Sequence, residues 1–229
     1  MKVLSKYCKY IVNTFRCKLS KSFDIKDSTI KYILYNINGL HNIINVYNSK
    51  VTKSSFSING DSNSINFKNS ANMYYTNINI VGKNNQVYLN GCAGILSLTL
   101  RGNHCKVIIG KGSTMEDCYM VCMGQENSIT IGNDCMFSGK VEIWNSDTHL
   151  ITDMEGNNIN PSKPISIGNH VWLGKGVKIL KGVNIGHNSV IGMGSIVTKH
   201  IMDNSIAAGN PARIIKNNIK WEKGYLSNK

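Results

Sequence analysis

Aliphatic residues recur at intervals of six between residues 167 and 197. The first set is Ile167, Leu173, Ile179, Ile185, Ile191 and Val197, and the residues four places after its first five members are Val171, Val177, Val183, Ser189 and Ser195. A period of six fits neither the 3.6-residue repeat of an α-helix nor the two-residue alternation of a single strand. It predicts an all-β solenoid, a parallel β-helix built from hexapeptide repeats, in which each side supplies a short strand and a corner.

Stacking explains why such a repeat is stable. Three six-residue sides close one triangular turn, and each aliphatic side chain packs on its equivalents in the turns above and below. The residue four places later also points inward, at a corner where only a small side chain fits. Gly168, Gly174, Gly186 and Gly192 follow aliphatics of the first set and relieve the backbone there. The repeat alone does not fix the hand of the coil, because parallel crossovers are right-handed by default.

A longer repeat extends the coil toward the N-terminus. Similar phrases begin at Gly39, Gly60, Gly82, Gly102 and Gly124, which are spaced 21, 22, 20 and 22 residues apart. These spacings match one 18-residue turn with a few residues of bulge. Residues 30 to 130 are therefore predicted to be coil with less regular sides.

The repeat is interrupted after Ile143 and returns at Ile165. From Ile143 to Ile167 is 24 residues, a multiple of six, so the coil can resume in register after ejecting a loop at about residues 145–163. Loops ejected from regular scaffolds commonly carry function. This loop contains Asp147, His149, Asp153 and Glu155.

The first 21 residues combine apolar residues at helical spacing with six Lys or Arg residues and no acid. They are predicted to form a short basic amphipathic N-terminal helix. Two interpretations stay open: attachment to an anionic membrane face, and a cap over the first coil. The expected divisions are an N-terminal segment 1–27, a β-helix 28–213 and a C-terminal tail 214–229.

Composition narrows the partners and the compartment. The 26 Lys and Arg outnumber 13 Asp and Glu, giving a net charge of +13 that favours anionic partners. No aromatic–basic motif supports nucleic acid. Seven cysteines without metal-ligand spacing are expected to be reduced thiols of a cytoplasmic protein, with no bound metal. No apolar run reaches the ~20 residues needed to span a bilayer.

Three segments carry a resemblance to a known family. IGNDCMFSGKVEIWNSDTH, IGNHVWLGKGVKILKGV and AAGNPARIIKNNIKW, in this order, resemble the acetyl-CoA-dependent O-acetyltransferases of the left-handed β-helix class, and most closely the bacterial capsule and sialic acid O-acetyltransferases. The resemblance implies a left-handed coil and a homotrimer with sites between subunits. It also implies direct acetyl transfer from acetyl-CoA to a glycan hydroxyl.

The resemblance assigns roles to residues of the loop. It places the general base at His149, and a neutral imidazole is suited to accept the proton of a sugar hydroxyl as that hydroxyl attacks a thioester. Asp147 is a candidate to orient the imidazole or to contact the acceptor, with a turn-forming Asp as the alternative. Trp172 is expected to project over the thioester end, with shielding of a subunit seam as the alternative. The backbone amide that binds the developing oxyanion is expected at the corner from Trp172 to Lys175.

The same resemblance places acetyl-CoA along an edge of the coil. Its expected contacts are Trp172, Gly174, Lys175, Gly192, Met193, Thr198, Lys199 and Arg213. Small corner residues let the cofactor approach the backbone, and cations meet its phosphates. Met193 stands where relatives carry alanine and is expected to narrow the channel.

The sequence thus predicts an O-acetyltransferase acting on a bacterial surface polysaccharide, with sialic acid as one candidate, or on its sugar precursor. Two alternatives stay open. One is an N-acetyltransferase acting on a nucleotide-linked amino sugar, and the other is a non-catalytic β-helix scaffold. The expected location is the cytoplasm, with peripheral attachment to the inner face of the membrane through residues 1–21 if that helix binds lipid.

Overall fold

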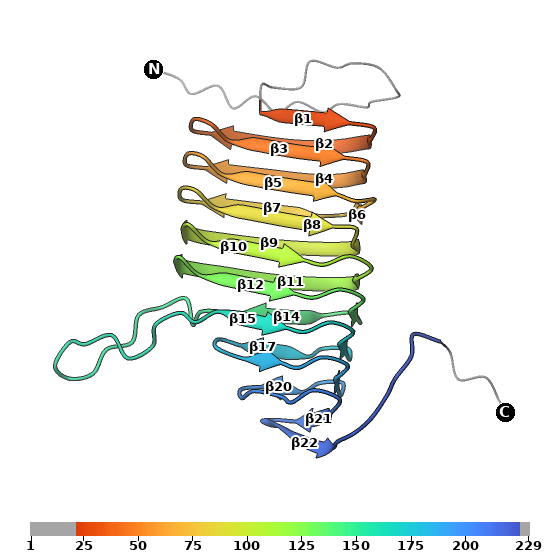
Figure 1. The fold of residues 1–229 in the computed structure, drawn as a ribbon. Helices are drawn as coiled ribbons and strands as arrows, with labels where there is room; N and C mark the ends of the chain where they lie inside the picture. The colour runs from red at the N-terminus through yellow and green to blue at the C-terminus, as the bar shows by residue number, and fades with distance from the viewer. Residues whose placement is uncertain (1–21, 225–229) are drawn as a thin grey trace.

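In the computed structural model, which describes residues 22–224, the chain winds into a single tall coil of stacked turns (Figure 1). The strands at the front of Figure 1 point to the right, those behind point to the left, and the chain descends from one turn to the next. This sense of winding makes the coil left-handed. The predicted left-handed parallel β-helix with an ejected loop is confirmed.

Twenty-two strands build the described part of the chain. The 8-stranded sheet contains β1 (Phe23–Lys26), β3 (Ile43–Tyr47), β5 (Ser64–Lys68), β8 (Gln86–Asn90), β10 (Lys106–Ile109), β12 (Ser128–Ile131), β15 (Ile165–Ile167) and β18 (Asn184–Ile185). The 14-stranded sheet contains β2 (Thr29–Asn38), β4 (Lys50–Asn59), β6 (Asn72–Tyr74), β7 (Asn77–Val81), β9 (Ala93–Asn103), β11 (Thr114–Gln125), β13 (Met136–Phe137), β14 (Val141–Trp144), β16 (Trp172–Leu173), β17 (Lys178–Leu180), β19 (Val190–Ile191), β20 (Ile196–Val197), β21 (Ile206–Gly209) and β22 (Ala212–Lys216).

The coil has three faces. Face 1 is the 8-stranded sheet, from β1 at one end to β18 at the other. The 14-stranded sheet bends over the other two: β4 pairs with β6 through Lys50–Thr52 and with β7 through Ser55–Asn59. Face 2 therefore contains β6, β13, β16, β19 and β21, face 3 contains β7, β14, β17 and β20, and the long strands β2, β4, β9 and β11 cross both.

The aliphatic columns seen in the sequence form the core. Ile131, Ile167 and Ile185 are partners in successive strands of face 1, and Ile179 pairs with Val197 on face 3. These side chains are at most 3% exposed. Burying an aliphatic side chain contributes about 1.5–3 kcal/mol. A column that runs the length of the coil can therefore stabilise a chain that has no second layer.

The edge between faces 3 and 1 explains the longer glycine repeat. Gly39, Gly60, Gly82, Gly102 and Gly124 stack along it, with φ between +111° and +141°. A Cβ on Gly102 would lie 1.8 Å from the carbonyl oxygen of Gly124. Glycine is required here for two reasons. The φ angles are positive, in a region where residues with a Cβ are strained, and the turns are too close together to leave room for a Cβ. Inside this edge Asn63 and Asn85 accept hydrogen bonds from the backbone of the next turn and are fully buried.

Five of the seven cysteines lie in residues 22–224, and all five are buried and unpaired. Burial raises the pKa of the Cys92 thiol to about 12, so this sulfur stays protonated and packs as a small apolar side chain. All five of these side chains lie in the interior of the coil.

The β-helix was expected at 28–213; strand β1 begins at Phe23 and strand β22 ends at Lys216. These two strands continue the pairing: β1 pairs in parallel with β3, and β22 turns back antiparallel on β21. The expected basic helix at 1–21 lies outside the described residues. Within those residues the chain contains no helix, and none is therefore long and apolar enough to cross a bilayer.

Candidate active site

The ejected loop is an arm, residues 145–163, that leaves the coil between β14 and β15. Its two ends are joined by a hydrogen bond from the Lys163 amide to the Asn145 carbonyl, 3.0 Å. The fully buried Asn145 side chain also accepts from the Met123 amide at 2.7 Å and donates to the Met123 carbonyl at 3.2 Å. Asn145 is thus the residue that closes the base of the arm and returns the chain to the coil in register.

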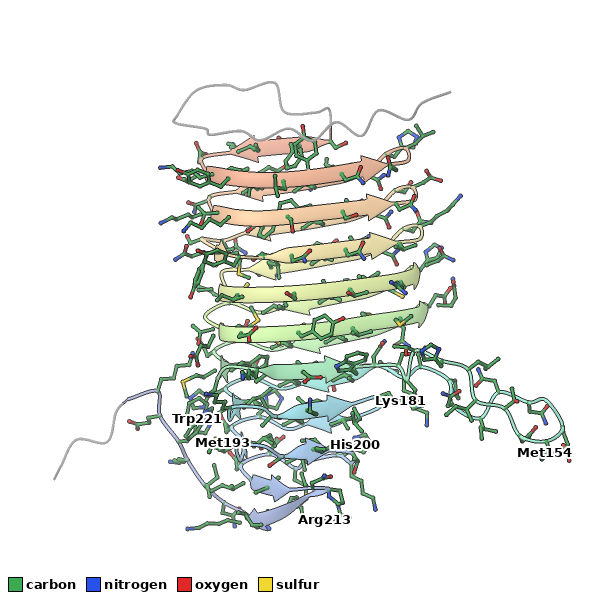
Figure 2. All side chains as sticks on the ribbon, turned by 180° about the vertical axis from the view of Figure 1, so that it is seen from behind. Met154, Lys181, Met193, His200, Arg213 and Trp221 are labelled. Carbon is green, nitrogen blue, oxygen red and sulfur yellow. The ribbon has the colours of Figure 1, made fainter. Side chains whose placement is uncertain are left out.

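The arm is ordered along its length by its own hydrogen bonds. Asp153 accepts from the amides of Glu155 and Asn157 and from the Asn157 side chain, which forms the turn at the tip. Nearer the coil, the Ile159 amide donates to the Ile151 carbonyl at 3.0 Å. Figure 2 shows Met154 at the far end of the arm, well away from the coil. Met154 is fully exposed and Leu150 is 69% exposed, so the arm presents apolar side chains to whatever lies beside it.

His149 lies near the base of the arm with its side chain exposed. Its backbone is held on both sides: the amide donates to the Asp147 carbonyl at 2.8 Å, and the carbonyl accepts from Asn160 Nδ2 at 2.9 Å. No hydrogen bond joins its ring to another residue of 22–224. By contrast, His187 and His200 use Nδ1 to accept a backbone amide at 2.9 Å. Of these three, only His149 has both ring nitrogens open to a substrate.

Asp147 has a different partner from the one considered in the sequence. Its Oδ2 accepts from Asn160 Nδ2 at 3.0 Å and from Lys181 Nζ, and none of its hydrogen bonds reaches the His149 ring. The Lys181 ammonium, with help from Asn160, holds the pKa of Asp147 below its usual value. Lys181 Nζ also donates to the Asn160 carbonyl at 3.1 Å. In this structure Asp147 fastens the arm to the coil and does not orient the imidazole.

Four of the expected cofactor residues line one edge of the coil, between faces 2 and 3. We call this the glycine edge: Gly174, Lys175, Gly192 and Met193. The turns approach closely. A Cβ on Gly174 would lie 2.7 Å from the Met193 amide nitrogen, and a Cβ on Gly192 would lie 3.0 Å from the Cβ atom of Ala208. Met193 itself is 75% exposed and projects from the edge. The result is a backbone ridge that an extended ligand can follow at short range.

Trp172 lies beside the glycine edge on face 2 and is 37% exposed. Its neighbour is Trp221, with ring centroids 5.9 Å apart. Trp221 in turn stacks on His170, 4.1 Å between centroids and 6° from parallel, and donates from Nε1 to the His170 carbonyl at 3.0 Å. The tail beyond β22 turns back along the coil, and Trp221 forms a wall next to Trp172.

The remaining expected cofactor residues do not all lie at this edge. Arg213, on β22, pairs with Ala208 and so lies below Gly192. Thr198 and Lys199 follow β20 at the edge between faces 3 and 1, where Lys181 occupies the turn above. We call this second edge the arm edge, because the arm leaves the coil from it. Figure 2 shows Met193 and Trp221 on one side of the coil and Lys181 and His200 on the other.

Sequence reasoning missed a hollow on face 2. It has a volume of about 400 Å³ and is lined by Tyr74, Ala93, Gly94, Thr114, Met115, Glu116, Met136, Phe137 and Ser138. Met136 pairs with Trp172 in the next turn, so the hollow lies directly above the tryptophan. Glu116 accepts from the Gly139 amide at 3.0 Å, which fixes its carboxylate. A break in register between Met115 and Cys118, which no six-residue rule reveals, contributes to the hollow.

No group of three His, Cys, Asp or Glu side chains within residues 22–224 is arranged to hold a metal ion. The groups gathered at the two edges offer acid–base and electrostatic chemistry: an imidazole without a hydrogen-bond partner among the described residues, lysines at both edges and an exposed backbone ridge.

Comparisons with known proteins identify relatives of this chain. The family model for the hexapeptide repeat of succinyl-transferase matches residues 164–199. A polysialic acid O-acetyltransferase of Neisseria meningitidis is 34% identical over 150 residues, which is 56% of this chain and 70% of that protein. One of Escherichia coli O1:K1 / APEC is 40% identical over 119 residues, 52% of this chain but only 38% of that protein.

Two solved structures match nearly the whole length. The polySia-specific acetyltransferase NeuO has a TM-score of 0.76 at 32% identity, covering 92% of this chain and 93% of its own. The polysialic acid O-acetyltransferase OatWY has a TM-score of 0.75 at 30% identity, covering 90% and 94%. The similarity therefore includes the irregular upper turns as well as the strict repeats.

Proposed function

The chain belongs to the O-acetyltransferases of the left-handed β-helix class, and we propose from this membership that it moves an acetyl group from acetyl-CoA to a hydroxyl of an acidic bacterial surface polysaccharide, with polysialic acid as the first candidate. The observation that carries the proposal is the placement of His149. Its ring is open to a substrate, while its backbone is held by Asp147 and Asn160 on an arm fastened to the coil.

The proposed reaction is a direct transfer. The acceptor oxygen attacks the thioester carbonyl carbon while His149 accepts the hydroxyl proton, and a tetrahedral oxyanion forms. When this intermediate collapses, the C–S bond breaks, the sulfur leaves as the thiol of coenzyme A with a proton returned from His149, and the acetyl ester remains on the sugar. Holding both reactants in line supplies much of the acceleration.

Acetyl-CoA is assigned to the glycine edge. Small residues at Gly174 and Gly192 let its pantetheine chain lie against the backbone, and Trp172 covers the thioester end. Lys175 at this edge and Arg213 on β22 below it are cations that can meet its phosphates. Trp221 lies on the side of Trp172 away from the glycine edge, and it bounds the same channel there.

The position of the two edges favours a site shared between subunits. In one chain the arm edge and the glycine edge lie on opposite sides of face 3, joined by strands such as β17. A homotrimer with face 3 turned inward brings the arm edge of one subunit, with His149 and Lys199, against the glycine edge of the next. Face 3 suits close approach, since its outward residues include Ser55, Ser57 and Ser97. The exposed apolar residues of the arm would then be covered by the neighbour.

The charge and the cofactor fit a cytoplasmic enzyme that meets an acidic acceptor. The net charge of +13 attracts both the phosphates of acetyl-CoA and a carboxylate-rich glycan. Attachment of residues 1–21 to the inner face of the membrane stays a prediction.

The proposal is tested by incubating the protein with acetyl-CoA and single acceptors and following free thiol release. The acceptors are α2,8-linked sialic acid polymer, a neutral capsule polysaccharide and a nucleotide-linked amino sugar. Of the three acceptors, we expect only the acidic polymer to raise thiol release above the acceptor-free rate. Release with the amino sugar alone would favour the N-acetyltransferase, and release with none of them would favour a non-catalytic scaffold.

A further inference from the structure

The outward side of face 1 carries a basic surface that the proposed acetyl-transfer site does not use. Two lysines lie over tyrosine rings there. Lys68 Nζ is 5.8 Å from the ring centroid of Tyr47, and Lys106 Nζ is 5.3 Å from that of Tyr88. Each ring holds its ammonium group close to the sheet through a cation–π interaction, which reduces the side-chain freedom that a ligand would otherwise have to freeze.

A hydrogen-bonded amide network makes the floor of this surface rigid. Asn45 Nδ2 donates to Asn66 Oδ1 at 2.8 Å, and Asn66 Nδ2 donates to the Val87 carbonyl at 3.1 Å. Tyr88 donates from its hydroxyl to Gln86 Oε1 at 3.3 Å. The floor therefore spans β3, β5 and β8 without a loop, and its polar groups keep fixed positions.

The surface is positive and its charge is not neutralised locally. Strands β3, β5, β8, β10 and β12 contain no Asp or Glu. Of the acids at its border, Asp24 accepts from the Tyr47 hydroxyl and Asp61 pairs with Lys83 at 3.0 Å. All 13 acids of the chain lie within residues 22–224, and none of them forms an ion pair with Lys68 or Lys106.

The two lysines are set diagonally across the face. Lys68 is in register with Asn90 and Lys106 with Gln86, so they are four residues apart along the strands and two strands apart across the sheet. At about 3.3 Å per residue and 4.8 Å per strand, their Cα atoms are roughly 16 Å apart. A single ligand that pairs with both ammonium groups needs two anionic groups and an extended shape, as a polyanionic chain has.

The lower end of the surface leads to the arm. Lys106 pairs with Ser128 of β12, and the adjacent Asn127 donates from Nδ2 to Ser162 Oγ of the returning arm at 2.9 Å. Figure 1 shows face 1 toward the viewer, with the arm leaving at the level of β14 and β15, below β10 and β12. A chain whose reacting sugar lies at His149 can therefore continue from the arm base across face 1.

We propose that face 1 around Lys68 and Lys106 is an accessory binding site for an acidic polysaccharide chain, separate from the site of acetyl transfer. This inference rests on the proposed function for the identity of the polymer. Carboxylates of the polymer pair with the two ammonium groups, and the remaining sugars lie along the amide floor. The site raises the affinity for long acceptors and takes no part in the chemical step.

The experiment compares wild-type protein with the double variant Lys68→Gln/Lys106→Gln in two measurements. The first is direct binding to α2,8-linked sialic acid polymer by affinity electrophoresis, which needs no turnover. The second is KM and kcat for that polymer and for a three-residue sialic acid oligomer that is too short to span the arm and face 1. The matched control is Lys53→Gln, because Lys53 also lies over a tyrosine, 5.1 Å from the Tyr75 centroid, but on the edge between faces 2 and 3.

We expect the double variant to bind the long polymer roughly tenfold more weakly, as for the loss of two partly exposed charge contacts. KM for the polymer should rise by a similar factor, while kcat and KM for the oligomer stay unchanged and Lys53→Gln resembles wild type. Unchanged polymer binding would overturn the proposal, as would equal losses on polymer and oligomer with an unaltered thermal melt. The same electrophoresis is run with a DNA duplex. If the double variant loses binding to DNA but binds the polymer like wild type, the face is a nucleic-acid site and the proposal is overturned.

The two proposals fail separately. If no acceptor supports acetyl transfer, the proposed function fails, yet the electrophoretic shift still tests the accessory site. If transfer occurs but the double variant binds the polymer normally, only the accessory site is lost.

Discussion

Lys181 donates a hydrogen bond to the carboxylate of Asp147, which joins the base of the arm to the coil turn that follows β17. The two residues are 34 positions apart in the sequence and come together because the arm leaves and re-enters the same edge. This contact fixes where the arm begins, and so fixes where His149 lies relative to the coil.

Asp147→Asn should therefore weaken the anchorage without removing the base. We expect kcat to fall severalfold at pH 7, with acetyl-CoA affinity unchanged. Lys181→Met should give the same loss, since it removes the same contact, while Asp153→Asn at the tip of the arm should have little effect. A full loss of turnover in Asp147→Asn would indicate a direct role in the chemistry.

The same contact predicts a pH dependence of arm stability. Lys181 lowers the pKa of Asp147 below its usual 3.8, so the folded state favours the charged form. The stabilisation from this contact is complete above pH 3.8. It is lost as the pH falls through the lowered pKa that Asp147 has in the folded state. Pepsin should therefore cut the arm of Asp147→Asn faster than that of the wild type at pH 4.5, and the two rates should converge at lower pH. A difference that persists at the lowest pH would contradict this account.

His149→Asn should lower kcat by roughly 10²–10⁴, the usual contribution of a positioned general base. The base acts on the acceptor, so the dissociation constant for acetyl-CoA should stay within about twofold of wild type. The matched control is His104→Asn, because His104 is an exposed histidine on the same edge in an upper turn. More than about a tenth of the wild-type rate in His149→Asn would show that another group accepts the proton.

Mixed assemblies test the shared site. His149→Asn and Trp172→Ala should each be inactive, and the two chains should recover activity when unfolded together and refolded at equal amounts. If each site takes His149 from one subunit and the glycine edge from the next, an intact site needs the Trp172→Ala chain in the first position and the His149→Asn chain in the second. Each has a probability of about one half, so about one site in four is intact. No recovery, with trimers formed, would place both groups of a site in one subunit.

The stacked glycines predict large stability effects that depend on position. Gly102→Ala meets a carbonyl at 1.8 Å and an unfavourable φ of +141°, whereas Gly156→Ala at the tip of the arm has a φ of +88° and open space. Backbone strain alone costs on the order of 1–3 kcal/mol. We expect a loss of about 3 kcal/mol or more for Gly102→Ala, and a clearly smaller loss for Gly156→Ala. Denaturant titration of the two variants measures this, and equal losses would contradict the stacking argument.

The regular part of the fold could be predicted because its period is set by geometry. Every six-residue side adds one aliphatic to the column, so the Ile167–Val197 pattern specified the coil before any contact was known. The upper turns were harder, because bulges stretch them to 20–22 residues, yet the glycine spacing marked the edge between faces 3 and 1, where successive turns approach closely.

The division of the site between two edges was also present in the sequence. Residues 18 apart share an edge, as Gly174 and Gly192 do, and so do Lys181 and Lys199. Residues that differ by about six, such as Gly192 and Lys199, lie on different edges. Lys199, expected beside acetyl-CoA together with Gly192, therefore lies on the arm edge of its own chain.

Other features depend on contacts that no period encodes. The tail beyond β22 has no repeat, so the stack of Trp221 on His170 could not be placed. The preference of Asp147 for Lys181 depends on the path of the arm, which the sequence leaves open once the repeat is broken.

We predict that the product of this protein is an acetyl ester on an acidic polysaccharide. This prediction is tested most directly by transferring radiolabelled acetyl from acetyl-CoA to α2,8-linked sialic acid polymer, isolating the polymer, and treating it with neutral hydroxylamine, which cleaves esters and spares amides. We predict that wild-type protein labels the polymer, that His149→Asn does not, and that hydroxylamine releases the label. Label that resists hydroxylamine, or a polymer that stays unlabelled while wild-type protein consumes acetyl-CoA on an amino sugar, would contradict the account.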